Sequence, residues 1–277
     1  MRHSPPTNHM IIDRQRLDEL IRHPFAPPGP AELKREGNVF FIGGGLDPRE
    51  TLETVFDSHC QAPAELMTIT FGSPESFHAG EEHVRLLKKN FHIHLLGQID
   101  YPAPGYLLER AYAAGIDIID IPLHTFDPGL SREPGLHREE RLAALETAKG
   151  IFPAWGVAST INVGEEASSS TVSAIDTLLS SGVVPLPQIT TRAGNYPRTE
   201  MEEVFDHLAG ELKRRKVAMK PFLPLLALTT PFTAGKPAGV LKGFIDLLQD
   251  RRLLAASDLR RSLRIRQVEE SYGSSGL

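Results

Sequence analysis

The chain has 277 residues, of which 30 are Lys or Arg and 35 are Asp or Glu, so its formal net charge is −5. This mild acidity gives no general attraction to nucleic acid, and the longest strongly apolar run, 222–228, is too short to cross a bilayer. The single cysteine, Cys60, excludes an internal disulfide and any metal centre that needs three or four thiolates from this chain. The first residues lack the apolar stretch of a signal peptide, and we expect a cytoplasmic protein.

Residues 1–37 are rich in proline and hold one short helical pattern, 13–21. We expect this segment to be an N-terminal arm laid on the main domain. From residue 38 onward, apolar β-branched runs alternate with helical patterns. The predicted strands are 38–43, 66–70, 91–96, 116–123, 155–163, 183–189 and 217–223. The predicted helices are 106–114, 137–149, 170–180 and 199–216, the last beginning with a Thr199/Glu202 capping box.

Strand starts recur about every 25 to 40 residues, which is the spacing of βα units and indicates parallel strands with helices outside. Prolines in the last two predicted strands suit strand ends better than the middle of a flat sheet. These features favour an α/β fold of the parallel (β/α) TIM type, as a partial barrel over 38–250, above an open doubly wound sheet. Residues 251–277 hold six arginines and are predicted to form a basic helical tail, either a solvated terminal helix or a docking element for an acidic partner.

The first predicted barrel strand ends in a glycine run, Gly43, Gly44 and Gly45, followed by Asp47. Glycines at this place either form a tight turn or present backbone N–H groups to a ligand. In the second case they bind a cofactor, or hold a phosphate or carboxylate.

Histidines lie at the next strands: His92 and His94 in the third, and His124 after the fourth. Such histidines either bind a divalent metal ion, supply acid–base chemistry or pack under a helix. We expect no metal site, and we expect His94 and His124 near the active rim, where the carboxyl ends of barrel strands carry function.

The fifth predicted strand ends at Asn162, Gly164 and Glu165. Gly164 permits a tight exit, and Glu165 can hold a ligand amine or hydroxyl near the start of the next helix. Asn162 would be costly to bury without a partner, and Gln188 ends the sixth predicted strand. We take His94, His124 and Glu165 as catalytic candidates, and Asn162, Gly164 and Gln188 with the glycine run and Asp47 as candidate cofactor-binding residues.

Three segments, taken in order, resemble the radical S-adenosylmethionine superfamily near its biotin synthase branch. They are IGGGLDP at 42–48, LLERAYAAGIDIIDIPLHTFDP at 107–128 and HREERLAALETAKGIFPAWGVASTINVGEE at 137–166. The likeness covers about 38–230 and implies S-adenosylmethionine as a cofactor. The family's CxxxCxxC loop for a [4Fe–4S] cluster is missing, and Gly45 stands where that family has an acidic residue. No such cluster is therefore expected, and hence no 5′-deoxyadenosyl radical from this chain alone.

Three functions remain open at this point. A degenerate barrel without the cluster would act as a scaffold or partner in cofactor or metabolite biosynthesis, beside an intact radical S-adenosylmethionine homologue or another protein subunit. A small-molecule ligand kept in the pocket would permit non-radical chemistry by His94, His124 and Glu165. A barrel with no relation to that superfamily would be a lyase or transferase. We favour the first of these functions. We do not expect the protein to bind nucleic acid or membranes.

Overall fold

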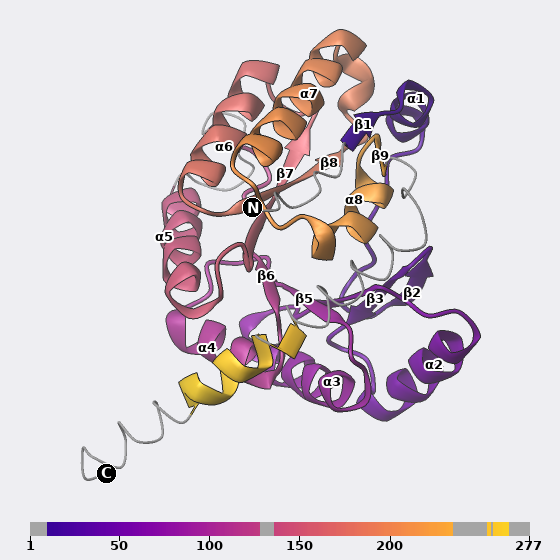
Figure 1. Ribbon diagram of the computed structural model, residues 1–277, viewed down its shortest axis with the longest axis vertical. Coiled ribbons are helices and arrows are strands. Elements are labelled where there is room, and N and C mark those ends of the chain that lie inside the picture. Colours follow the sequence, from indigo (N-terminus) through magenta and orange to yellow (C-terminus); the bar gives the residue numbers. More distant parts are fainter. Residues whose placement is uncertain (1–9, 128–135, 235–253, 256, 266–277) are drawn as a thin grey trace, which may run out of the picture.

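The computed structural model describes residues 10–127, 136–234, 254–255 and 257–265. A seven-stranded sheet curls through the molecule, with helices along its outer face (Figure 1). Its strand order, β2-β3-β4-β5-β6-β7-β8, follows the chain. The β2–β3 pair is antiparallel and the other five pairs are parallel. Within the described residues β2 and β8 do not pair with each other, so the sheet is a half-barrel, in line with the partial α/β barrel predicted.

The sheet consists of β2 (Leu33–Glu36), β3 (Val39–Gly43), β4 (Leu66–Thr70), β5 (His94–Gln98), β6 (Ile118–Asp120), β7 (Val157–Val163) and β8 (Val184–Ile189). The helices are α1 (Arg14–Arg22), α2 (Pro48–Gln61), α3 (Phe77–Asn90), α4 (Gly105–Ala114), α5 (Leu136–Ile151), α6 (Ser168–Ser180), α7 (Arg198–Arg214) and α8 (Leu223–Thr229). A separate ribbon joins β1 (Met10–Ile12) to β9 (Phe232–Ala234) in antiparallel pairing.

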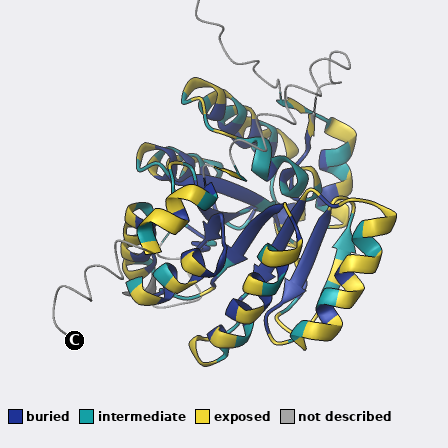
Figure 2. Ribbon diagram, turned by 60° about the horizontal axis from the view of Figure 1, so that its bottom comes forward, coloured by how far each residue is buried: buried dark blue, intermediate teal, exposed yellow. Residues whose placement is uncertain are grey.

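Alternating side chains of the strands build two cores, one on each face of the sheet. On β3, Phe40 and Ile42 pack in the larger core under the outer helices, whereas Val39 and Phe41 belong to the smaller core on the concave face. Because both faces are covered, β3 to β8 are buried along nearly their whole length (Figure 2). This double burial is why they appear in the sequence as continuous apolar runs.

The predicted strand at 217–223 is wrong. These residues lead into a 3₁₀ turn, Lys220–Phe222, and then into α8. Pro221 and Pro224 lie in first turns, where a missing N–H costs no hydrogen bond, whereas in a strand each would remove one. Phe222 of the 3₁₀ turn and Leu226 of α8 pack in the concave core. The seventh strand of the sheet is β2 and not the predicted strand at 217–223.

The proline-rich N-terminal segment forms part of the folded domain. It supplies β1, α1 and β2, so the expected boundary at residue 37 falls inside the β2–β3 hairpin. The predicted capping box is wrong, because α7 follows Pro197 with no side-chain cap. Cys60 lies exposed within α2.

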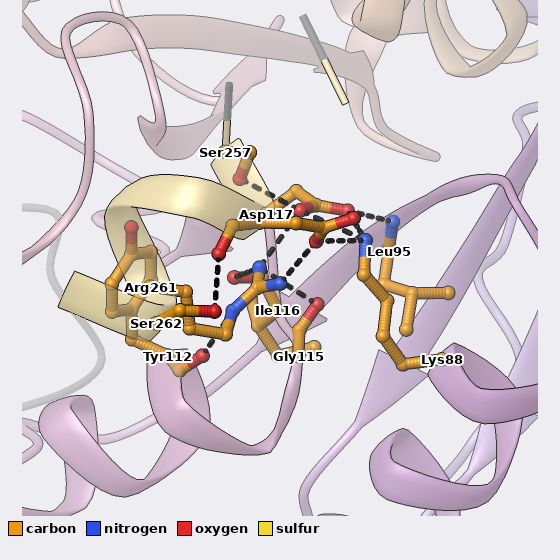
Figure 3. Close-up of polar contacts among 10 residues, drawn as sticks. Lys88, Leu95, Tyr112, Gly115, Ile116, Asp117, Ser257, Arg261 and Ser262 are labelled. Carbon is orange, nitrogen blue, oxygen red and sulfur yellow. Dashed lines mark hydrogen bonds and ion pairs between the residues drawn. The ribbon is translucent and has the colours of Figure 1, made fainter. Parts of the chain in front are cut away.

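Part of the expected C-terminal tail packs on the barrel; its remaining residues lie outside those described. We call residues 257–265 the tail helix. Its Arg261 side chain is only 7% exposed and lies 2.8 Å from the Asp117 carboxylate, which Lys88 also approaches at 3.0 Å (Figure 3). Arg261 further donates to the carbonyl oxygens of Tyr112, Gly115 and Ile116. Burial raises the pKa of Asp117, but the charges of Lys88 and Arg261 outweigh it and hold that pKa below its usual value.

Candidate functional site

Polar side chains line the concave face of the half-barrel towards the carboxyl ends of its strands. They surround a cavity of about 40 Å³, which is room for a few water molecules. The polar lining residues are Thr68 on β4, Gln98 on β5, Asp120 on β6, Thr160 on β7, Gln188 on β8 and Thr229 on α8. In parallel barrels this end of the strands is where ligands bind.

Asp120 is the central group of this cavity and is 1% exposed. One carboxylate oxygen accepts from the Thr160 backbone N–H at 2.8 Å, and the other from the Thr160 hydroxyl at 2.7 Å. The Gln98 amide donates to this second oxygen at 3.2 Å. All three donors are neutral, and within the described chain no Lys, Arg or His forms an ion pair with Asp120.

The electrostatics of Asp120 follow from this burial. Removal from water raises the pKa of the carboxyl group, and the hydrogen bonds from Thr160 offset only part of that rise. A carboxyl group with a raised pKa in a concave site is typical of functional positions. Its signal in the sequence is an Asp within a run of apolar residues, IDIIDIPL, but Asp120 is not among the candidates predicted from the sequence.

Apolar residues from two distant segments cover the cavity. Phe25 and Pro27 come from the stretch between α1 and β2, and Leu225 comes from α8. Gln188 holds this cover by donating to the Phe25 carbonyl at 2.9 Å. A ligand much larger than a few water molecules therefore requires the 25–27 segment or α8 to move.

A second group of polar residues lies at the rim beside Asp120. The His124 Nε2 is 3.0 Å from an Asp100 carboxylate oxygen, and the buried Arg141 guanidinium contacts the same oxygen at 3.0 Å. The His124 backbone has a φ of 60°, a left-handed conformation that is uncommon for a residue other than glycine and that is enriched at functional sites. His124 and Asp100 are both partly open to solvent, with side chains 42% and 55% exposed.

The two rim groups stabilise each other's charged forms. Burial alone would lower the pKa of His124, but the hydrogen bond and charge of Asp100 raise it above its usual value. For Asp100, burial would raise the pKa, and His124 together with Arg141 lowers it. The pair therefore favours the protonated form of the His124 imidazole.

The glycine run has a packing role in this structure. The N–H groups of Gly43, Gly44 and Gly45 already donate to backbone carbonyls of Glu32, Thr70 and Pro30. A Cβ on Gly44 would lie 2.7 Å from the Thr70 carbonyl oxygen, so glycine is needed for close approach of backbone to backbone. The expectation that these N–H groups are offered to a ligand does not match this arrangement. Asp47 accepts from the N–H groups of Arg49 and Glu50 and caps α2.

The other candidates are divided between two ends of the sheet. Asn162 and Glu165 come together, with the Asn162 amide 3.2 Å from the Glu165 carboxylate, and Gly164 makes the tight exit with a φ of 87°. His94 starts β5 and is buried at the amino end, where Asp117 lies, whereas His124 lies beyond the carboxyl end of β6. The expectation that His94 and His124 line one pocket is therefore wrong. His92 is exposed before β5, so the three histidines form no common site.

The cysteine content does not fit an iron–sulfur cluster. Such clusters are held by several cysteine thiolates, and Cys60, the one cysteine of the chain, lies exposed on the outer helix α2. Among the described helices, none combines the length and apolar character of a membrane span.

No protein-family model matches the chain, and no curated protein sequence matches it. Among solved structures, the chain is similar to the crystal structure of methylornithine synthase (PylB), with a TM-score of 0.45 and 18% sequence identity. The alignment covers 65% of this chain and 60% of that one, so the chain spans less than two thirds of this neighbour.

Proposed function

We propose that this chain is a half-barrel protein that binds a small polar molecule on its concave face and generates no radical itself. One observation carries the proposal: Asp120 is fully buried in a cavity at the carboxyl ends of the strands, and neutral groups are its only hydrogen-bond partners in the described chain. A buried carboxylate without a counter-charge destabilises a fold. Binding of a ligand explains why the chain carries such a group at this place.

The chemistry available supports binding more than radical formation. With one cysteine the chain does not hold the cluster that reduces S-adenosylmethionine in the superfamily that the sequence resembles. S-adenosylmethionine itself remains a candidate ligand, and its binding would require movement of the cover formed by Phe25, Pro27 and Leu225.

The test is a binding screen on the full chain. Thermal shift and calorimetric titration would be run with small amines, carboxylates, polyols and S-adenosylmethionine, each against the wild type, Asp120→Asn and Asp176→Asn. Asp176 is a matched control because it is a half-exposed carboxylate on α6 that pairs with His207. We expect at least one class to bind the wild type and the Asp176 variant and to lose affinity in the Asp120 variant. Binding by no class, or equal binding to all three proteins, would refute the proposal.

The rim favours a second function, a non-radical enzyme with His124 as proton donor or acceptor. The specific observation is a left-handed histidine whose ring is oriented by Asp100 and whose pKa is raised. Its test is turnover of the compound identified in the screen by His124→Gln and Asp100→Asn. Under this hypothesis both variants bind the compound but lose turnover, whereas unchanged turnover would leave binding alone as the function.

A further inference from the structure

The hydrogen-bonding capacity left over in the cavity is strongly biased towards acceptors. The hydroxyl groups of Thr68 and Thr160 each have a single proton, and both donate within the protein, to the Phe40 carbonyl at 3.2 Å and to Asp120 at 2.7 Å. The amide nitrogens of Gln98 and Gln188 donate to Asp120 and to the Phe25 carbonyl. What these side chains still offer is mainly oxygen lone pairs.

The carboxylate and the two amides are the strongest acceptors that the described lining still offers a ligand. The amide oxygens of Gln98 and Gln188 accept no hydrogen bond from the described residues. Asp120 accepts three hydrogen bonds, and a carboxylate offers about four lone-pair positions. The two amides keep one N–H each and the Thr229 hydroxyl has one proton, whereas the two amides, Asp120 and the threonine hydroxyls all keep oxygen lone pairs. Acceptors therefore outnumber donors among the described lining residues.

The charge around the cavity is also incomplete. Among the described residues that line it, none is Lys or Arg. His124 acts on Asp120 through its charge, but its Nε2 is held at the rim by Asp100, and Arg141 contacts that same carboxylate. A cationic ligand would supply the missing counter-charge to Asp120, whereas an anionic ligand would add to the cost of its burial.

We propose that the ligand of this cavity is a primary alkylamine in its protonated form, with the ammonium group donating to Asp120 and to the amide oxygens of Gln98 and Gln188. An ammonium group has three donors and no acceptor, which matches three acceptor groups. The apolar walls formed by Phe41, Leu96 and Leu186 suit the carbon atoms next to the nitrogen. This inference rests on the proposed binding function and specifies its ligand class.

The experiment uses the full chain and four small probes at equal ionic strength: methylammonium, methanol, acetate and potassium ion. Binding is measured by NMR chemical-shift titration and by thermal shift in the wild type, Asp120→Asn, Gln98→Leu and Asp176→Asn. We expect methylammonium alone to bind the wild type, with affinity reduced at least about 30-fold in Asp120→Asn and unchanged in Asp176→Asn. We expect Gln98→Leu to weaken methylammonium binding less than Asp120→Asn does. If the Asp120 variant does not fold, the Gln98 variant tests the proposal in its place.

The outcomes separate the two proposals. Binding of methanol or acetate at Asp120 with no binding of methylammonium would overturn the amine inference and leave the binding function standing. Stronger binding of potassium than of methylammonium would replace the amine by a metal cation. If no probe binds here and no class binds in the wider screen, both proposals fail.

Discussion

Arg261 is the side chain through which the tail helix is expected to stabilise the half-barrel. Substitution by methionine keeps a similar length and the apolar contact with the Tyr112 ring, which the guanidinium carbon approaches at 5.2 Å. It removes the 2.8 Å ion pair with Asp117 and the donors to three backbone carbonyls (Figure 3). Both partners of the ion pair are at least nine-tenths buried.

The size of the effect follows from that burial. Removal of one partner from a buried ion pair costs about 3–5 kcal/mol. Lys88 stays 3.0 Å from Asp117 and still neutralises it, so we expect the lower end, about 3 kcal/mol. At about 2–4 °C for each kcal/mol in a chain of this size, the Tm should fall by about 6–12 °C.

The assay is urea and thermal unfolding followed by circular dichroism, with Arg260→Met as the matched control. Arg260 is exposed on the same helix and should change stability by less than about 0.5 kcal/mol. Hydrogen exchange of the amides at 257–265 shows whether the helix detaches locally before the barrel unfolds. Equal stability of the Arg261 and Arg260 variants, with the tail helix still protected from exchange, would refute the reasoning.

Three further predictions concern the site and its support. Asp120→Asn should stabilise the protein relative to wild type, and increasingly so as pH rises. The folded-state pKa of Asp120 is raised, so the stability that wild type has below the unfolded pKa is lost as pH rises through the folded pKa. The difference in urea midpoint between the two proteins, measured near pH 4 and near pH 8, tests this, and an equal difference at both pH values would contradict it. An NMR titration should give His124 a pKa above its usual value, and this pKa should fall in Asp100→Asn. An unchanged titration in the variant would exclude Asp100 as the cause. The stability that the pair contributes is present below the unfolded pKa of His124 and is lost as pH rises through its folded pKa. Gly44→Ala should destabilise the fold by about 1–3 kcal/mol because its Cβ would lie 2.7 Å from the rigid Thr70 carbonyl; a Tm equal to wild type would show that the backbone gives way.

The sequence alone determined the parallel α/β architecture. Strands buried on both faces leave unbroken apolar runs, and that local signature placed β3, β4, β7 and β8 within two residues of their bounds. The amphipathic patterns of α4 to α7 were equally readable, because each helix buries one face against the sheet. The half-barrel followed from the order of these elements.

Tertiary structure decided which polar residues share a site. His94 and His124 are both next to apolar strands in the sequence, but strand register puts them at opposite ends of the sheet. Asp120, Gln98 and Thr160 come together because parallel neighbours align their carboxyl ends, and no local pattern encodes that alignment. The sequence also did not predict which segments cover the concave face. Phe25 and α8 pack there because burial of apolar area against distant strands, and not strand propensity, determines the structure of 217–229.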